Sequence, residues 1–300
     1  MSTILETKLS LPIIHKGKVR DTYDLGDKLL LIATDRISAF DSVLPCGIPD
    51  KGLVLNQLSA FWFSKTKHII PNHVIDLIDT SDSLNKYLPN GIIAPDYLVG
   101  RSMVIRKAER VPVEAVVRGY VSGSAWAECQ ASGTISGIAQ PKGIKESQEL
   151  PYPMFTPTTK ADTGHDLPLT QKELEDLVGK STAQALEEKS IAIYQFARDY
   201  AQSRDIIIAD TKFEFGFIEG NLSLIDELLT PDSSRFWDIT KYIIGQSQPS
   251  YDKQPTRDWL TASGWNKEPP APTLPKEIIE ETSERYRMAF NKLVGREIQK

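Results

Sequence analysis

The sequence is poor in cysteine and histidine. It contains two cysteines and four histidines in 300 residues. Cys46 and Cys129 stand far apart, and the histidines show no spacing typical of a zinc motif. The cysteines therefore predict free thiols in a reducing compartment rather than a disulfide framework. These absences exclude a small disulfide-stabilised protein and argue against a zinc-binding domain.

The sequence also lacks a basic excess, a signal peptide and a long apolar run. Its 35 Lys and Arg residues are outnumbered by 40 Asp and Glu residues, for a formal net charge of −5. This balance argues against a nucleic acid or an anionic membrane as partner. No apolar stretch approaches membrane-spanning length, and the polar start MSTILETKL does not resemble a signal peptide. We therefore expect a cytoplasmic protein with no nucleic-acid or membrane partner.

No Walker A motif and no G-x-G-x-x-G motif occurs, so a nucleotide site would have to be built from other residues. One candidate begins a predicted hairpin over residues 15–34, where Lys16, Lys18 and Arg20 alternate beside Gly17. The glycine would let backbone N–H groups approach a phosphate, and the cations would neutralise its charge. A basic strand face that is merely solvated is the alternative interpretation.

The most highly charged strand pattern lies in residues 206–235. Asp210, Lys212 and Glu214 share one face of a predicted strand, while three phenylalanines occupy the other. A three-residue loop would place Asp226 of the return strand directly opposite Glu214. Two carboxylates this close repel each other unless a cation lies between them, and Mg²⁺ is suited to that role. A hairpin neutralised by Lys212 through salt bridges is the alternative.

A second polar strand face precedes this hairpin in the chain. After a strand predicted over Met103–Lys107, Glu114 and Arg118 alternate on one face of the next strand. Ser124 is expected to cap the helix that follows, and the start of a helix favours a bound anion. An anion pocket that includes Arg118 and a purely structural cap are both compatible with this pattern.

Loops supply the remaining polar candidates. Asp41 ends the polar segment TDRISAFD, and Arg235 in TPDSSRFWD suits a phosphate or carboxylate. Residues 134–169 lack periodicity and predict a long functional or mobile loop, which contains Lys160, Asp162, His165 and Asp166. Helices are predicted over 54–67, after a capping box at Thr170 and Glu173, over 181–204 and up to Val294, where Gly295 ends the last one.

Five segments, in this order, resemble the motifs of one family. They are GKVRDTY (17–23), TDRISAFD (34–41), VPVEAVVRGYVSGS (111–124), IADTKFEFG (208–216) and DELLTPDSSRFWD (226–238). Together they resemble phosphoribosylaminoimidazole-succinocarboxamide synthase, the SAICAR synthetase family of purine biosynthesis. The segment YDKQPTRDWL (251–260) resembles the longer members of that family, such as those of fungi.

The resemblance implies a ligase that uses ATP and Mg²⁺. The family joins L-aspartate to the carboxylate of 4-carboxy-5-aminoimidazole ribonucleotide (CAIR) and releases ADP and phosphate. The implied fold is α+β and two-lobed, similar to the ATP-grasp and protein-kinase architecture. A small β-rich lobe over residues 1–108 would cover ATP, and a larger α+β lobe over 109–300 would bind substrates and metal. The implied partners are these small molecules, and a monomer is favoured.

The resemblance also assigns roles to charged positions of this sequence. Asp210 and Lys212 are placed near the reacting carboxylate as catalytic residues, and Glu214 and Asp226 are assigned to the metal. The residues assigned to ATP are Lys16, Gly17, Lys18, Val19, Arg20, Lys107 and Glu214. Those assigned to the substrates are Asp41, Arg118, Ser124, Lys160, Asp166 and Arg235.

Two other classes of function are compatible with fold and charge pattern alone. A small-molecule kinase that phosphorylates a hydroxyl would not depend on aspartate. A non-catalytic nucleotide-binding module would tolerate the loss of its metal carboxylates. The ligase chemistry, by contrast, explains the residue types, since phosphoryl transfer requires positioning and charge neutralisation rather than a protein nucleophile. The expected intermediate is an acyl phosphate formed on the CAIR carboxylate.

Overall fold

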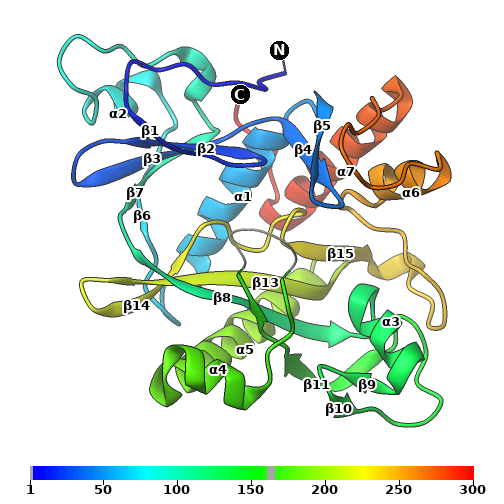
Figure 1. Cartoon of the computed structure of the whole chain (residues 1–300). Helices are drawn as coiled ribbons and strands as arrows, with labels where there is room; N and C mark the ends of the chain where they lie inside the picture. The colour runs from blue at the N-terminus through cyan, green and yellow to red at the C-terminus, as the bar shows by residue number, and fades with distance from the viewer. Residues whose placement is uncertain (1–2, 161–165) are drawn as a thin grey trace.

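The computed structural model describes residues 3–160 and 166–300. In that part of the chain, two larger β-sheets are combined with helices in an α+β architecture (Figure 1). A five-stranded sheet is built from residues 13–106, and a six-stranded sheet from residues 109–238. No helix in these two described ranges is long and apolar enough to cross a membrane.

The N-terminal sheet has the strand order β1-β2-β3-β7-β6, and every neighbouring pair is antiparallel. The predicted hairpin is confirmed for β2 and β3, whose turn is closed by the Leu25 N–H donating to the Lys28 carbonyl at 3.0 Å. The strands of this sheet are β1 (Ile13–Lys16), β2 (Arg20–Asp24), β3 (Lys28–Ala33), β6 (Val74–Leu77) and β7 (Ser102–Arg106).

The predicted alternation of Lys16, Lys18 and Arg20 on one strand face is wrong. The chain bends between β1 and β2, where the Gly17 N–H donates to the Arg20 carbonyl at 2.7 Å. Lys16 therefore ends β1, Lys18 lies in the bend, and Arg20 begins β2. Alternation with period two requires a continuous strand, and the glycine-containing bend interrupts it.

The larger sheet has the order β11-β8-β13-β14, with β12 paired to β8 and β15 paired to β13. Its centre is β13, which contacts β8, β14 and β15 along its 13 residues. The predicted alternation is confirmed, because Phe213 and Phe215 are buried in the core while Lys212 is exposed. The strands are β8 (Glu109–Tyr120), β11 (Glu149–Phe155), β12 (Thr158–Thr159), β13 (Ile206–Ile218), β14 (Asn221–Ile225) and β15 (Ser234–Asp238).

The turn from β13 to β14 is one residue shorter than predicted. Ile218 pairs with Asn221, so two residues, Glu219 and Gly220, connect the strands. Both have positive φ, with values of 50° and 79°. Positive φ at both central positions is the requirement of a type I′ turn, which matches the twist of the flanking strands.

This shorter turn shifts the pairing register of the hairpin. Glu214 pairs with Ile225, so the predicted placement of Asp226 directly opposite Glu214 is wrong by one residue. Asp226 follows the end of β14 and has a φ of 67°, a left-handed conformation in which the chain leaves the strand.

Helices cover the larger sheet and enclose the main core. α5 packs against β8 and β13, while α1 lies between the N-terminal sheet and α7 (Figure 1). The core includes Trp62 of α1, Tyr194 of α5, Phe213 of β13 and Phe290 of α7, all of which are buried. The α-helices are α1 (Lys51–Thr66), α2 (Ser81–Asn85), α3 (Gly123–Ser132), α4 (Gln171–Val178), α5 (Lys180–Gln202), α6 (Gln254–Ala262) and α7 (Lys276–Val294), with short 3₁₀ helices at Asp96–Leu98 and Ile239–Lys241.

The helix signals in the sequence are confirmed. Thr170 and Glu173 form the reciprocal hydrogen bonds of a capping box at the start of α4. Gly295 ends α7 with a φ of 78°. Each signal depends on residues three or four positions apart, so it survives whatever the helix packs against.

The prediction of a loop over residues 134–169 is only partly correct. The described residues of this segment form four short strands, of which β11 is the longest. Pro151 and Pro153 hide the alternation of β11, and they are tolerated because β11 lies at the edge of the sheet. The other strands outside the two main sheets are β4 (Arg36–Ala39), β5 (Ser42–Gly47), β9 (Thr134–Ile135) and β10 (Ile138–Ala139).

Candidate active site

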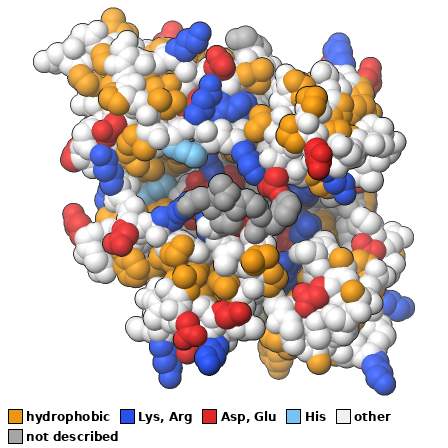
Figure 2. Space-filling model, in the orientation of Figure 1, with side chains coloured by type: hydrophobic (Ala, Val, Ile, Leu, Met, Phe, Trp, Pro, Cys, Tyr) orange, Lys and Arg blue, Asp and Glu red, His pale blue; other side chains and the backbone are white. Residues whose placement is uncertain are grey.

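Charged side chains from distant parts of the chain meet on one face of the larger sheet. In the register of β8 and β13, Glu114 stands opposite Glu214, and Arg118 stands opposite Asp210. The polar faces predicted for two separate strands are thereby joined into one. Figure 2 shows acidic and basic side chains gathered in the middle of this side of the molecule, between the regions of the two sheets.

Two lysines neutralise the carboxylates of Glu114 and Glu214. Lys160 Nζ lies 2.5 Å from a carboxylate oxygen of Glu114 and 2.7 Å from one of Glu214. Lys212 Nζ lies 3.1 Å from the same Glu114 oxygen. The structure thus brings together three predicted residues, Lys160, Lys212 and Glu214. The prediction omitted Glu114, although its position on the same strand face as Arg118 was a signal that could have identified it.

Asp210 is the acidic centre of a second group. Its carboxylate accepts hydrogen bonds from Arg235, from Arg118 at 3.2 Å and from the Ser122 hydroxyl at 3.3 Å. Arg118 also donates to the Ser124 hydroxyl at 3.2 Å. Asp210, Arg118, Ser124 and Arg235 are therefore neighbours, as their common assignment to substrate and catalysis requires.

The predicted helix cap is displaced by two residues. α3 begins at Gly123, so Ser122 rather than Ser124 is its N-cap. Gly123 has a φ of 56°, and a Cβ placed there would lie 2.2 Å from a guanidinium nitrogen of Arg235. The glycine therefore lets this arginine approach the start of the helix closely. An anion bound there would meet helix N–H groups and arginine side chains together.

Arg20 connects the N-terminal sheet to the loop that follows β14. Its guanidinium lies 2.5 Å from Asp226 and 3.2 Å from Glu227. Lys18, from the bend before it, pairs instead with Asp41 at 2.7 Å, and both of those side chains are largely exposed. Arg20 is therefore the cation of the first hairpin that reaches the carboxylates of the larger sheet.

The other predicted residues lie away from these groups. Lys16 Nζ is 3.5 Å from Glu6, and Lys107 Nζ is 2.9 Å from Asp24. The carbonyl of Val19 accepts a hydrogen bond from the Thr34 N–H at 3.0 Å. Asp166 is exposed and directly follows residues 161–165. Asp162 and His165 lie outside the described residues.

Burial and neighbouring charges move the pKa values of the carboxyl groups apart. Burial raises the pKa of Glu214, and the negative charge of Asp226 raises it further. Burial would also raise the pKa of Asp226, but Arg20 and the other nearby cations outweigh it and lower that pKa. This coupling places the charges of Glu214 and Asp226 close together, although the two residues are not register partners.

The Glu214 and Asp226 pair is a suitable site for a divalent cation. Within residues 3–160 and 166–300, no three His, Cys, Asp or Glu side chains are arranged to hold a metal ion by themselves. Mg²⁺, however, is commonly held by one or two carboxylates, with phosphate oxygens and waters completing its coordination. Two buried carboxylates whose charges repel fit that donor set.

A buried ion cluster, which we call the Asp232 cluster, holds the loop that follows β14. The Asp232 carboxylate lies 2.7 Å from Lys51 Nζ, 3.9 Å from Lys253 Nζ and 2.5 Å from the Tyr286 hydroxyl. The side chain of Lys51 is completely buried. The cluster ties α1, the start of α6 and α7 to the loop that carries Asp226. Neither lysine was predicted as part of the site, because each is distant in sequence from Asp232.

Replacing Asp232 with asparagine is expected to destabilise the fold by about 3–5 kcal/mol at pH 7, because the mutation leaves the buried Lys51 ammonium without its counter-charge. Burial alone would raise the pKa of Asp232, but Lys253, Lys51 and Tyr286 outweigh it and lower that pKa. A carboxyl group whose pKa is lowered by folding stabilises the folded state above its unfolded pKa of about 4. This contribution is lost as the pH falls further.

Urea unfolding of the wild type and of Asp232→Asn between pH 7 and pH 3 measures this contribution. The difference in free energy of unfolding should stay constant down to about pH 4–5 and shrink below it. Asp176→Asn on the exposed side of α4 is the control and should stay within about 0.5 kcal/mol of the wild type. Equal stability of Asp232→Asn and wild type at pH 7 would contradict the structural role of the cluster.

Comparison with known proteins identifies the family. A model of the family described as SAICAR synthetase matches residues 13–272. The phosphoribosylaminoimidazole-succinocarboxamide synthase of Thermodesulfovibrio yellowstonii is 50% identical over 295 residues, which cover 98% of this chain and 99% of that protein.

Solved structures agree with the sequence comparison. The SAICAR synthase of Saccharomyces cerevisiae, solved in complex with SAICAR, is 42% identical and has a TM-score of 0.89, with 98% of this chain and 99% of that chain covered. A more distant SAICAR synthetase, solved in complex with ADP, shares the fold at 23% identity, with a TM-score of 0.68 and coverage of 95% and 98%. The resemblance noted in the five sequence motifs is therefore confirmed. This chain belongs to the SAICAR synthetase family.

Proposed function

We propose that this chain is an ATP-dependent ligase that joins L-aspartate to the carboxylate of CAIR and produces SAICAR, ADP and phosphate. The observation that carries this proposal is the meeting of two charged groups on adjacent strands. One group pairs Lys160 and Lys212 with Glu114 and Glu214, and the other surrounds Asp210 with two arginines. Such a site can hold a polyphosphate, an acidic substrate and a metal ion side by side.

The ATP phosphates are proposed to lie beside the bend between β1 and β2. Lys16, Gly17, Lys18 and Val19 form the bend region, and Arg20 reaches from it to Asp226. The weak surface pairs of Lys16 with Glu6 and of Lys18 with Asp41 can exchange for phosphate, since exposed ion pairs contribute only about 0–1 kcal/mol. The strand around Met103 and Lys107 is proposed to border the adenine.

Glu214 and Asp226 would hold Mg²⁺ together with the phosphate oxygens. The ion, when bound, would supply neutralisation of the charge that develops on the transferred phosphoryl group. The protein's own residues position the two carboxylates for this role. Lys160 holds Glu214, and Arg20 holds Asp226, so each carboxylate keeps its orientation.

CAIR is proposed to bind across the Asp210 group. Arg118, Arg235, Ser124 and the start of α3 suit its 5′-phosphate, with Asp41 assigned to the same substrate. Asp210 and Lys212, two positions apart on one face of β13, then lie near the reacting carboxylate. Lys160 and Asp166 are assigned to the side where aspartate and the ribonucleotide meet.

The chemistry that fits this arrangement is activation of the CAIR carboxylate. A carboxylate oxygen of CAIR bonds to the γ-phosphorus of ATP as the bond to the ADP oxygen breaks. The aspartate amine then attacks the acyl carbon, and phosphate leaves with one oxygen that came from CAIR, while the amine loses a proton. Phosphoryl transfer of this kind depends on positioning and electrostatic stabilisation. Lysines and arginines on a rigid sheet provide both.

Incubation of the protein with ATP, Mg²⁺, CAIR and L-aspartate tests the function directly. SAICAR and ADP should form together, and omission of aspartate should stop SAICAR formation. A kinase acting on a hydroxyl would instead form ADP and a phosphorylated product without aspartate. The cytoplasmic location, the monomeric state and the division into lobes at residue 108 are further proposals that this assay does not test.

Replacing Arg235 with lysine is expected to raise KM for CAIR by about tenfold or more, although the positive charge is kept. Lysine cannot reproduce the planar fork that contacts Asp210 and would contact a phosphate. Steady-state kinetics with varied CAIR measure the effect. Arg198→Lys on α5, where the guanidinium pairs with neighbouring Asp199, is the matched control. Unchanged KM for CAIR in Arg235→Lys would place the phosphate pocket elsewhere.

A further inference from the structure

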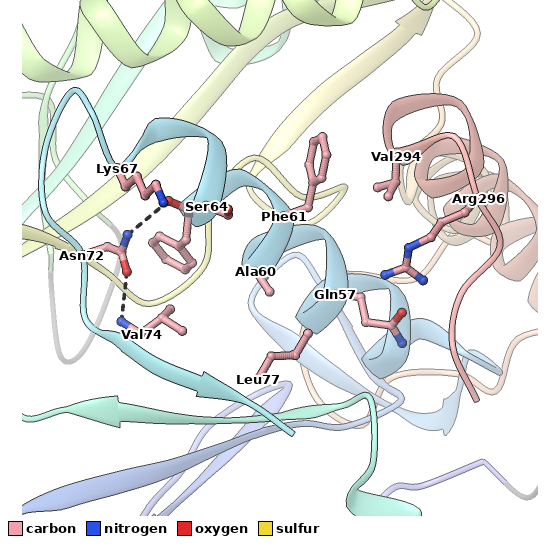
Figure 3. A pocket seen from close by; sticks show the side chains of 11 residues that line it. Gln57, Ala60, Phe61, Ser64, Lys67, Asn72, Val74, Leu77, Val294 and Arg296 are labelled. Carbon is pink, nitrogen blue, oxygen red and sulfur yellow. Dashed lines mark hydrogen bonds between the residues drawn. The ribbon is translucent and has the colours of Figure 1, made fainter. Parts of the chain in front are cut away.

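A cavity of about 480 Å³ lies along the side of α1 (Figure 3). Its lining comes from α1, from the segment that leads into β6, and from the end of α7 with the residues after it. This volume is in the range of small-molecule sites, which is about 300–1,000 Å³. The cavity is separate from the charged groups of the candidate active site, whose space is filled by their own ion pairs.

The hollow has a simple cause in the sequence of α1. Gln57, Ala60, Phe61, Ser64 and Lys67 recur at intervals of one helical turn and therefore share one side of the helix. The two residues in the middle of this stripe, Ala60 and Ser64, are small. They leave space between the larger side chains around them, and Phe61 with Leu77 of β6 provides apolar wall.

The charge of the lining is one-sided. Lys67 and Arg296 line the cavity, and no acidic residue does. Figure 3 shows these two cations at opposite ends of the cavity, with Ala60 between them. Across the described part of the chain, neither cation forms an ion pair. Both side chains belong to exposed residues and are available to a ligand.

We propose that this cavity binds an elongated organic dianion, with an acidic group near each end and an apolar body between them. The cations at the two ends are complementary to the acidic groups, and the small and aromatic side chains between them suit the apolar body. α1 rises about 15 Å from Gln57 to Lys67, which sets the approximate length of the ligand.

The site is also independent of the proposed nucleotide site. The opposite side of α1, with Leu55 and Ser59, borders a small hollow beside Arg20 and Asp226. The two hollows therefore lie on different sides of one helix. A ligand in the larger cavity would contact α1, β6 and the end of α7 without touching the carboxylates proposed for catalysis.

Equilibrium binding of the disulfonate dye bis-ANS to the full chain, followed by its fluorescence, tests the proposal. We expect one saturable site, which Mg²⁺–ATP at saturation does not displace. Lys67→Glu and Arg296→Glu should each weaken binding by about tenfold or more, because each removes one charge-assisted contact and adds a repulsive charge. The monosulfonate ANS should bind the wild type more weakly than bis-ANS by a similar factor.

Two controls make the result specific. Lys172→Glu, a charge reversal at an exposed position of α4, should bind bis-ANS like the wild type. Ser64→Trp should block binding by filling the hollow, and Ser64 is exposed, so the fold should tolerate the change. Absence of saturable binding, wild-type affinity in both charge-reversal variants, or displacement of the dye by ATP would each overturn the proposal.

Discussion

Replacing Glu214 or Asp226 with alanine is expected to lower kcat by at least about 10²–10³-fold, the usual cost of removing one preorganised electrostatic group from an active site. The two carboxylates lie close enough for their charges to interact, and each is held by a cation from another part of the chain. Loss of either one removes a ligand proposed for Mg²⁺. Steady-state assays of SAICAR formation at a range of Mg²⁺ concentrations measure the effect.

The structure also predicts that both variants fold. After removal of Glu214, Lys160 still pairs with Glu114, and after removal of Asp226, Arg20 still pairs with Glu227. No buried cation is left without a partner, so thermal unfolding should change little. Glu219→Ala, an exposed position in the turn between β13 and β14, is the control and should keep full activity. Full activity of both variants at limiting Mg²⁺ would refute the assignment to the metal.

Replacing Lys212 with methionine is expected to slow phosphoryl transfer by about 10²-fold or more while changing the affinity for ATP much less. Lys212 Nζ pairs with Glu114, and its side chain remains 44% exposed on the face that the proposal gives to the reacting carboxylate. A cation at that position would stabilise negative charge that develops during transfer more than it stabilises bound ATP. Pre-steady-state measurement of ADP formation, combined with equilibrium binding of ATP, separates the two effects.

Heavy-oxygen labelling tests the same mechanism from the side of the substrate. With both carboxylate oxygens of CAIR labelled, the released phosphate should carry one labelled oxygen, because the acyl carbon loses that oxygen when the aspartate amine attacks it. Lys172→Met, at an exposed position on α4, should behave as wild type in rate. Label that enters phosphate only from labelled water would exclude the acyl phosphate. Equal losses in ATP affinity and transfer rate would make Lys212 a binding residue.

Local patterns predicted much of the site. The period-two alternation placed Asp210, Lys212 and Glu214 on one face of β13, and the buried phenylalanines on the other face confirm this placement. The same alternation placed Arg118 on a polar face of β8. These predictions succeed because the faces of a strand are determined by the backbone itself, independent of the partner that the strand meets. The family motifs added the assignments, since they lie on these same faces.

The errors have a common cause, which is that a single residue at a turn changes every pairing beyond it. The two-residue turn after β13 moved Asp226 out of the pairing with Glu214. The bend at Gly17 separated three cations that a continuous strand would have kept together. The cap of α3 shifted from Ser124 to Ser122. Turn geometry depends on φ and ψ choices that several sequences satisfy equally well.

The sequence by itself determined the elements, their polar and apolar faces and the family to which the chain belongs. The tertiary structure alone decided which charges meet. Arg20 and Asp226 are 206 positions apart, and Lys51 and Asp232 are 181 positions apart. Nothing in the local pattern pairs them, because a charge needs a specific partner only after packing has removed it from water. The packing of the two sheets and α1 brought Glu114, Lys51 and Lys253 to the site, and it left the cavity between α1 and the end of α7.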